Sequence, residues 1–208
     1  MSERRGREDV EIFDVETAYD GFFRLDVYDF RYRRFDGAWS RRHQREVFQR
    51  GPTAGILLYD PARDAVVLVE QMRTPAIDDP AGPWLLEVVA GIIDDGETAD
   101  AVVRREAEEE AGVTVRDLIP LFDSFLSPGG CTERISLFVG LVDSIGVGGV
   151  HGLDYEDEDI RVVVWPFDRA FAEIGKAIIT APAMICLQWL AMNRDRLRAE
   201  HAREGSGA

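Results

Sequence analysis

Apolar and polar side chains alternate along the first fifty residues, a pattern typical of half-buried β-strands. A strand is expected within Phe22–Phe35, a hairpin turn over 35–39, and another short strand over 44–51. The segment is too short to bury its many large apolar side chains by itself, so they must pack on another domain or on a second copy of the chain. We therefore treat residues 1–50 as a small antiparallel β-sheet extension and dimerisation segment.

Beyond residue 50 the pattern predicts one larger domain over residues 51–203, followed by a disordered tail over 204–208. Two apolar strands within 54–75 flank an Asp- and Pro-rich turn at 60–64, and further strands are predicted over 84–91, 118–127, 134–142 and 161–167. Helices are predicted over 98–112, 168–175 and 182–202, the last beginning at a proline. A glycine-rich stretch at 146–152 is expected to be flexible and leads into an acidic loop.

The composition and the net charge of the chain exclude several classes of protein function. The chain has 208 residues, 46% of them hydrophobic, and no apolar run that approaches the roughly 18 residues of a membrane span. The N-terminus carries arginines without an apolar stretch behind them, so we expect no signal peptide and a cytoplasmic protein. The net charge of −15 argues against nucleic-acid or membrane binding. Cys131 and Cys186 are the only cysteines and form neither a disulfide framework nor a metal cluster.

An unusual concentration of glutamates lies on the helix predicted between Thr98 and Gly112. Val103, Ala107 and Ala111 form a narrow apolar stripe for packing on a sheet, and Glu106, Glu109 and Glu110 lie together on an adjoining face. Like charges at this spacing destabilise a helix by roughly 0.2–0.5 kcal/mol per pair, and a bound cation reverses that sign. Oxygen ligands suit Mg²⁺ or Mn²⁺ rather than zinc. The alternative is a solvated acidic face without a ligand.

The spacing of these residues distinguishes the two interpretations. Gly91, five residues, Glu97, seven residues, Arg105-Glu106-Ala107, one residue, Glu109-Glu110, one residue, Gly112-Val113 is the complete pattern of the Nudix box. The sequence therefore resembles the Nudix hydrolases, which cleave nucleoside diphosphates linked to another moiety with a divalent metal. The resemblance implies an α+β fold, an α/β/α sandwich with a mixed sheet between helices.

Further motifs are similar to one subfamily, the bacterial ADP-ribose pyrophosphatases. Pro128 lies fifteen positions after Val113, within Ser-Pro-Gly-Gly and shortly before Thr-Glu-Arg. Similar segments are GFF at 21–23, REVFQRG at 45–51, EQMRTP at 70–75, PWLLEVVAG at 83–91 and HGLDYEDEDIRV at 151–162. The resemblance implies Mg²⁺-dependent hydrolysis of ADP-ribose to AMP and ribose 5-phosphate by a homodimer with exchanged N-terminal strands.

The resemblance also implies roles for residues near the box. The metal ligands are Glu106, Glu109, Glu110 and the backbone carbonyl of Ala90, and Arg105 orients the acids. Glu97 shapes the loop before the helix, and Glu87 is a supporting residue near the metals. The general base comes from the loop after the box, where Glu156 is the first candidate. Glu158 is the alternative, either as the base or as a metal ligand.

Substrate-binding residues follow from the same resemblance. The terminal ribose is expected at Glu133, in the loop that also carries Pro128 and Gly129. Phosphates are expected to contact Arg73 and Arg45, although either can be an ordinary surface arginine. Phe22 stacks on adenine or packs in a core.

Two kinds of rival remain open. The substrate can be another nucleotide sugar, such as GDP-mannose or ADP-glucose. The protein can instead be a sensor that binds ADP-ribose without cleaving it, or a structural protein with an acidic surface. A sensor has no need for Glu106, Glu109 and Glu110 together, so the intact box argues for an enzyme.

Overall fold

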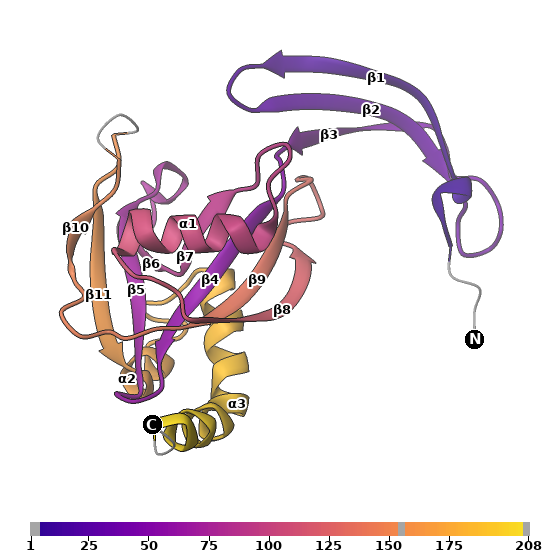
Figure 1. The fold of residues 1–208 in the computed structure, drawn as a ribbon. Helices are drawn as coiled ribbons and strands as arrows, with labels where there is room; N and C mark the ends of the chain where they lie inside the picture. Colours follow the sequence, from indigo (N-terminus) through magenta and orange to yellow (C-terminus); the bar gives the residue numbers. More distant parts are fainter. Residues whose placement is uncertain (1–4, 154–156, 206–208) are drawn as a thin grey trace. The chain divides into compact units, whose positions relative to one another are not determined.

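The computed structural model describes residues 5–153 and 157–205 (Figure 1). The chain forms two compact units. Unit 1 comprises Met1–Gly51 and Phe125–Arg134, and unit 2 comprises Pro52–Ser124 and Ile135–Ala208. Glu156 lies outside the described residues.

Unit 1 is a three-stranded antiparallel sheet in the order β1-β2-β3, preceded by a short 3₁₀ turn η1 (Arg7–Asp9). The strands are β1 (Val10–Asp20), β2 (Arg24–Tyr32) and β3 (His43–Gln49). The segment 125–134 joins this unit through the end of β3, where Phe48 donates to the Gly130 carbonyl at 2.8 Å and accepts from Thr132 at 3.0 Å. The loop with Pro128 and Gly129 therefore belongs to unit 1.

Unit 2 is built on a mixed sheet in the order β10-β11-β5-β4-β9-β8. Its strands are β4 (Thr53–Asp60), β5 (Ala65–Met72), β8 (Asp117–Phe125), β9 (Arg134–Leu141), β10 (Gly149–His151) and β11 (Ile160–Pro166). Two short strands extend it, because β6 (Trp84–Glu87) pairs with β5 and β7 (Val89–Ile92) pairs with β4. Every residue of β4 is buried, as a central strand covered on both faces requires.

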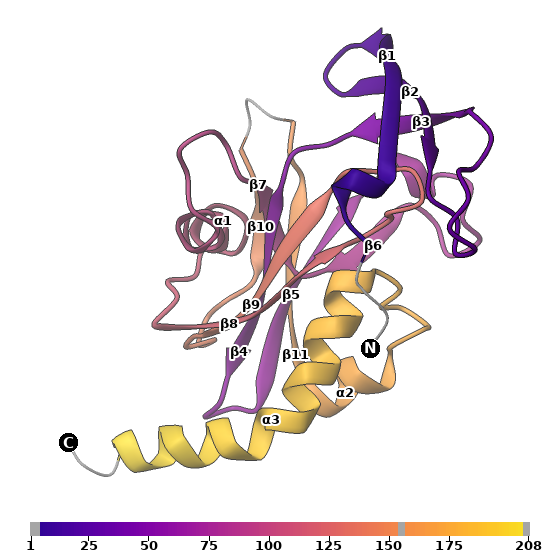
Figure 2. The same ribbon diagram turned by 90° about the vertical axis from the view of Figure 1, so that its right-hand side faces the viewer.

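Helices cover both faces of this sheet (Figure 2). On one side lies α1 (Ala99–Ala111), and on the other lie α2 (Phe167–Ala172) and α3 (Ala181–Gly205). Val103, Ala107 and Ala111 of α1 pack in the core with Ile56 and Val67 of the sheet. These layers confirm the α/β/α sandwich with a small antiparallel N-terminal sheet that the sequence predicted.

The ends of the helices follow local chemistry. Helix α1 begins after Thr98 and ends at Gly112, whose φ of 63° is left-handed and therefore suits glycine. Arg194 holds α3 against the rest of unit 2, because its guanidinium pairs with Asp64 after β4 and with Asp168 of α2 at 2.8 Å. No helix in the described part of the chain is long and apolar enough to cross a bilayer.

Several segments differ from the sequence prediction. The strand expected over 84–91 is two strands with Val88 between them, because one half pairs with β5 and the other with β4. The glycine-rich stretch at 146–152 is not wholly irregular, since Gly149–His151 form β10 along the edge of the sheet. Helix α3 also continues through Gly205, and residues 206–208 lie outside the description.

The turn between β4 and β5 is organised by one buried carboxylate. Asp60 is 1% exposed and accepts hydrogen bonds from the backbone of Ala62, Arg63 and Ser144 at 2.9–3.1 Å. The Ser144 hydroxyl donates at 2.7 Å and the Arg63 guanidinium at 3.1 Å. Burial by itself raises the pKa of Asp60, but these donors outweigh it and lower the pKa to about 2.

Candidate active site

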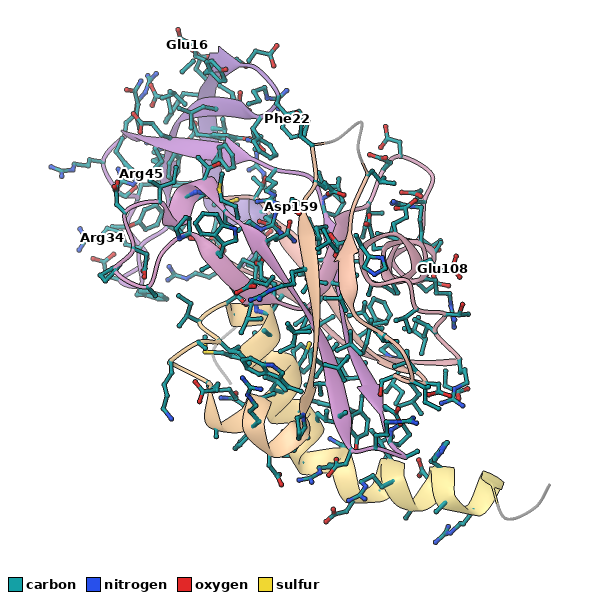
Figure 3. All side chains as sticks on the ribbon, turned by 90° about the vertical axis from the view of Figure 1, so that its left-hand side faces the viewer. Glu16, Phe22, Arg34, Arg45, Glu108 and Asp159 are labelled. Atoms are coloured by element: carbon teal, nitrogen blue, oxygen red, sulfur yellow. The ribbon has the colours of Figure 1, made fainter. Side chains whose placement is uncertain are left out.

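The glutamates of α1 divide between two faces of the helix. Glu108 is exposed and points away from the sheet (Figure 3). Glu106 and Glu109 are half-buried, and Glu110 is only 4% exposed. The helical period thus places three of the four carboxylates on the side of α1 that approaches the sheet or its edge.

Glu106 lies against the backbone of Gly91 in β7. A methyl group added at Gly91 would lie 2.0 Å from Glu106 Oε1, a separation that no real side chain tolerates. A side chain at this position would therefore force the Glu106 carboxylate to move away from the strand, and glycine allows the close approach. Burial raises the pKa of Glu106, and the neighbouring charges of Glu109 and Glu158 act in the same direction.

Arg105 contacts three of the acidic side chains around α1. Its Nη1 donates to Glu106 Oε1 and to Glu109 Oε2, each at 2.9 Å, and its Nη2 lies 3.6 Å from Glu97 Oε2. Glu97 also accepts a hydrogen bond from the backbone of Asp94 at 3.3 Å. Arg105 therefore fixes the orientation of two acids, while Glu97 ties the loop before the helix to the same arginine.

Glu110 is the most perturbed acid of the site. Burial, together with the charges of Glu106 and Glu158, raises its pKa to about 8, although the Arg73 charge and a backbone hydrogen bond from Ala90 oppose the shift. Within the described residues its Oε2 atom is buried without a hydrogen-bond partner. A buried carboxylate oxygen without a donor is destabilising unless another group binds it.

A divalent cation fits these residues. The donors are all oxygens, three carboxylates crowd one helix face, and the orphaned Glu110 Oε2 is the kind of atom that a cation satisfies. Over residues 5–153 and 157–205 no three acidic, His or Cys side chains are already grouped around one point as ligands. In this arrangement Arg105 forms ion pairs with Glu106 and Glu109.

Arg73 approaches the same carboxylates from the end of β5. Its Nε donates to Glu87 Oε2 at 2.7 Å, which joins the ends of β5 and β6. Its charge also lowers the pKa of Glu110, so the two side chains are within electrostatic reach. The half-buried Glu87, expected near the metals, therefore orients an arginine that remains 42% exposed.

The segment after β10 brings Glu158 to the acidic helix. Glu158 Oε2 accepts a hydrogen bond from the backbone of Leu153 at 3.3 Å, and its charge acts on both Glu106 and Glu110. The preceding residue of the sheet, His151, packs against Gly112 at the end of α1, where a Cβ atom would lie 2.8 Å from the ring. The sequence analysis did not predict this contact. The rarity of histidine, with three in the chain, was the signal that could have drawn attention to His151.

The other predicted substrate residues belong to unit 1. Phe22 is 87% exposed at the β1–β2 turn and contacts Phe23 edge-on, with ring centroids 4.7 Å apart. Pro128 and Gly129 are exposed in a turn, and the buried Glu133 lies 3.4 Å from Arg50. Arg45 is exposed on β3 (Figure 3). Unit 2 thus gathers Ala90, Arg105, the three helix carboxylates, Arg73 and Glu158, while unit 1 carries the rest.

Comparison with known proteins covers almost the whole chain. The NUDIX domain model matches residues 49–182, and the model of the GDP-mannose pyrophosphatase NudK N-terminal domain matches residues 9–48. An ADP-ribose pyrophosphatase of Escherichia coli K12 is 49% identical over 199 residues, which is 95% of each chain. One from Haemophilus influenzae is 41% identical and covers 92% of this chain and 90% of its own.

Other similar proteins carry a different name or a lower identity. A GDP-mannose pyrophosphatase of Pectobacterium atrosepticum is 37% identical over 195 residues, covering 88% of this chain and 97% of its own. A crystal structure described as an ADP compounds hydrolase aligns with a TM-score of 0.64 at 18% identity, over 91% of this chain and 98% of that one. At that identity the structural match supports the fold alone.

Proposed function

The chain belongs to the Nudix hydrolase family, and from this premise we propose that it hydrolyses the pyrophosphate bond of ADP-ribose. Water is added across the bond, and the products are AMP and ribose 5-phosphate. The observation that carries the proposal is the complete box on α1, in which buried Glu110 has an unpartnered oxygen among the described residues. The substrate is chosen from the names of the relatives at 49% and 41% identity.

Nudix ADP-ribose pyrophosphatases generally depend on a divalent metal, and we propose Mg²⁺, with Mn²⁺ as a substitute. Glu106, Glu109, Glu110 and the Ala90 carbonyl would hold the ion, which would lower the pKa of a bound water and neutralise phosphoryl charge. Arg105 holds the Glu106 and Glu109 carboxylates in a fixed orientation through two hydrogen bonds. Arg73, oriented by Glu87, presents a guanidinium suited to a phosphate oxygen.

A carboxylate in the loop after β10 takes the proton of the attacking water. Glu156 is the proposed base, and its position lies outside the described residues. Glu158 is the competing candidate, since its charge already acts on Glu106 and Glu110. Glu156→Gln is expected to lower turnover by roughly 10²–10⁴-fold while substrate still binds. A larger loss in Glu158→Gln reverses the assignment.

The substrate is tested by a panel of nucleoside diphosphate sugars with the purified protein, Mg²⁺ and added phosphatase to release inorganic phosphate. ADP-ribose is expected to give the highest kcat/KM, with AMP and ribose 5-phosphate identified by chromatography. A preference for GDP-mannose would favour the second candidate, which the 37% identical relative and the match of residues 9–48 support. Binding of ADP-ribose without turnover would indicate a sensor.

We also propose that the protein is a homodimer with exchanged N-terminal strands. The support is the apolar surface of unit 1, where large side chains are solvent-exposed in the single chain: Ile12, Phe13, Val15, Tyr19, Phe22, Tyr32 and Phe35. Exposed groups of this size are characteristic of protein interfaces, and a partner strand would also protect the sheet edges. In that arrangement Arg45 and Phe22 contribute to substrate binding in the active site of the neighbouring subunit.

Light scattering should then give a mass near twice 23.3 kDa. Exchange of strands is tested separately by mixing inactive Arg45→Ala with inactive Glu110→Gln protein and allowing subunits to exchange. Partial recovery of activity is expected, because some dimers combine an intact Arg45 with an intact Glu110 at one site. A monomeric mass would end the dimer proposal, and a dimer without recovery would confine each site to one chain.

A further inference from the structure

His151 lies between the segment that carries Glu158 and the end of the glutamate helix. It is the last residue of β10, where it pairs with Ile160 of β11, and β10 lies beside α1 (Figure 2). The residues between His151 and Ile160 therefore leave the sheet and return to it at one position of the ladder. The half-buried His151 ring reaches the end of α1. A side chain at this point can set the distance between that segment and the helix.

The His151 ring is held from two sides. Its Nε2 donates a hydrogen bond to the Gly148 carbonyl at 3.0 Å, because a carbonyl oxygen can only accept. On the other side, a Cβ atom added at Gly112 would lie 2.8 Å from ring Cε1 and 3.4 Å from Nδ1. Gly112 thus meets two requirements, since its φ of 63° ends α1 and its missing side chain leaves room for the ring. The ring therefore acts as a spacer between β10 and the C-terminal cap of α1.

The backbone that follows His151 is in close contact with Glu158. Gly152 has a φ of 111°, and a Cβ atom there would lie 2.7 Å from the Cβ atom and 2.7 Å from the carbonyl oxygen of Glu158. The Leu153 amide donates to Glu158 Oε2 at 3.3 Å, and the Glu158 amide donates to the Leu153 carbonyl at 3.4 Å. Glu158 is therefore tied, through its backbone and its side chain, to the two residues directly after His151.

These contacts form a closed loop with the acidic face of α1. Starting at Gly112, they run through the His151 ring to the backbone of Gly152. Gly152 then packs on Glu158, whose charge raises the pKa of Glu110 on α1. Glu110 lies two residues before Gly112, where the loop began. A change in the width of the His151 side chain therefore shifts the position of Glu158 relative to the helix.

We propose that His151 is a positioning residue, whose ring sets where Glu158 lies relative to the carboxylates of α1. The inference rests on the proposed function, in which Glu158 is a candidate for the base. His151 itself neither binds substrate nor takes a proton in this role, because it acts through Glu158. A variant without the ring should lose turnover, since the carboxylate is misplaced. It should keep substrate affinity, since the phosphate contact expected from Arg73 comes from the end of a different strand, β5.

The hold on Glu158 is measured first without any reaction, by amide hydrogen exchange of the full-length protein in EDTA, followed by NMR. His151→Ala is expected to speed exchange of the Leu153 amide by roughly 5- to 10-fold, because that amide loses its fixed acceptor on Glu158. The matched control is Val150→Ala, which shortens a side chain of the same strand that is 67% exposed and faces the opposite side. Leu153 exchange in this control is expected to match the wild type.

Steady-state kinetics with ADP-ribose and Mg²⁺ then measures the consequence. His151→Ala is expected to lower kcat by roughly 10- to 100-fold with KM unchanged, since a displacement of about 1 Å in a reacting group has an effect of this size. Gly152→Ala is the second variant, because its methyl group must displace Glu158 directly. The decisive measurement is the double variant, His151→Ala with Glu158→Gln. It is expected to lose no more kcat than Glu158→Gln alone, because a residue that acts through Glu158 has nothing left to position.

The proposal is overturned if the losses of His151→Ala and Glu158→Gln multiply in the double variant, or if Glu158→Gln leaves kcat unchanged. It is also overturned if His151→Ala matches Val150→Ala in exchange or in kcat. Circular dichroism controls for folding, and Gly152→Ala replaces His151→Ala in every measurement if the latter does not fold.

Failure of the proposed function has a separate signature, the absence of turnover by the wild type on every nucleotide sugar. In that case the exchange measurement decides alone. Faster exchange of the Leu153 amide in His151→Ala than in Val150→Ala supports the positioning of Glu158, and equal exchange overturns it.

Discussion

Two buried carboxylates in unit 2 have opposite surroundings. Asp60, at the β4–β5 turn, is 1% exposed and accepts five hydrogen bonds, and its pKa falls to about 2. Glu110, on α1, is 4% exposed, and one of its oxygens has no partner among the described residues. Its pKa rises to about 8. Two acids with almost no solvent exposure thus have pKa values displaced in opposite directions, downwards for Asp60 and upwards for Glu110.

The difference supports the proposal that Asp60 stabilises the fold and that Glu110 binds a ligand. The donors around Asp60 come from two separate loops, so its charge holds the β4–β5 turn to the segment after β9. Burial and the charges of Glu106 and Glu158 act on Glu110, and the Arg73 charge and one backbone hydrogen bond from Ala90 do not outweigh them. Burial with satisfied hydrogen bonds indicates a structural role, and burial without them indicates a binding or catalytic one.

The largest expected effect is on catalysis. Glu110→Gln keeps the shape of the side chain and removes its charge, so turnover of ADP-ribose at saturating Mg²⁺ is expected to fall by on the order of 10²-fold or more. The matched control is Glu108→Gln on the same helix, which removes the same charge from the exposed face. Near wild-type turnover in Glu110→Gln would show that the charge of Glu110 is not needed for catalysis.

The next effect is on the stability of the metal-free protein. The pKa of Glu110 rises from 4.5 to about 8 on folding, so the neutral acid stabilises the fold fully below pH 4.5. That contribution, a few kcal/mol at most, is lost as the pH rises towards 8. Urea unfolding in EDTA at pH 5 and pH 8 should show a larger loss for the wild type than for Glu110→Gln. Equal losses would mean that Glu110 does not titrate in this range.

Asp60→Asn should destabilise the protein by about 2 kcal/mol, because the amide cannot accept the same set of hydrogen bonds. The sign with pH is opposite to that of Glu110. The folded pKa is lower than the unfolded value of 3.8, so the Asp60 charge stabilises the protein above pH 3.8 and this contribution is lost as the pH falls to about 2. Unfolding midpoints measure the change at pH 7. An unchanged kcat for the folded variant would show that Asp60 acts on stability and not on catalysis.

The smallest effect is expected from the exposed partner of Asp60. Arg63 is 44% exposed and its guanidinium bridges Asp60 and Asp143 at 3.1 and 3.0 Å. Arg63→Gln keeps its backbone donor to Asp60, so the loss should be under about 1 kcal/mol. Thermal unfolding at low and high salt provides the measurement. If Arg63→Gln lost as much stability as Asp60→Asn, the β4–β5 turn would be stabilised mainly by the ion pair and not by the backbone donors.

Much of the fold could be predicted from local pattern. The period of apolar residues predicted α1, and its observed ends beside Thr98 and Gly112 lie within a residue of the predicted ones. The break at Val88 could not be predicted, because it depends on β6 and β7 pairing with different strands far away in the sequence. The short strand β10 was hidden by its glycines, since pairing with β11 rather than intrinsic preference makes it a strand.

The site was predictable where its residues share one helix. Fixed spacing on α1 was enough to identify Glu106, Glu109, Glu110 and Arg105 as one group. The contact between Glu106 and Gly91 and the pairing of Arg73 with Glu87 depend on how separate strands meet.

The parallel pairing of β4 with β9 sets a condition on how the chain reaches this structure. Thr53 lies beside Ile135 and Tyr59 beside Leu141, so 82 residues separate every pair along this central ladder. Loop closure over that distance is slow, and the contact must await the release of β9 from the ribosome. During synthesis β4, whose residues are all buried in the folded protein, therefore keeps one unpaired edge until β9 emerges, and an unpaired strand edge favours aggregation.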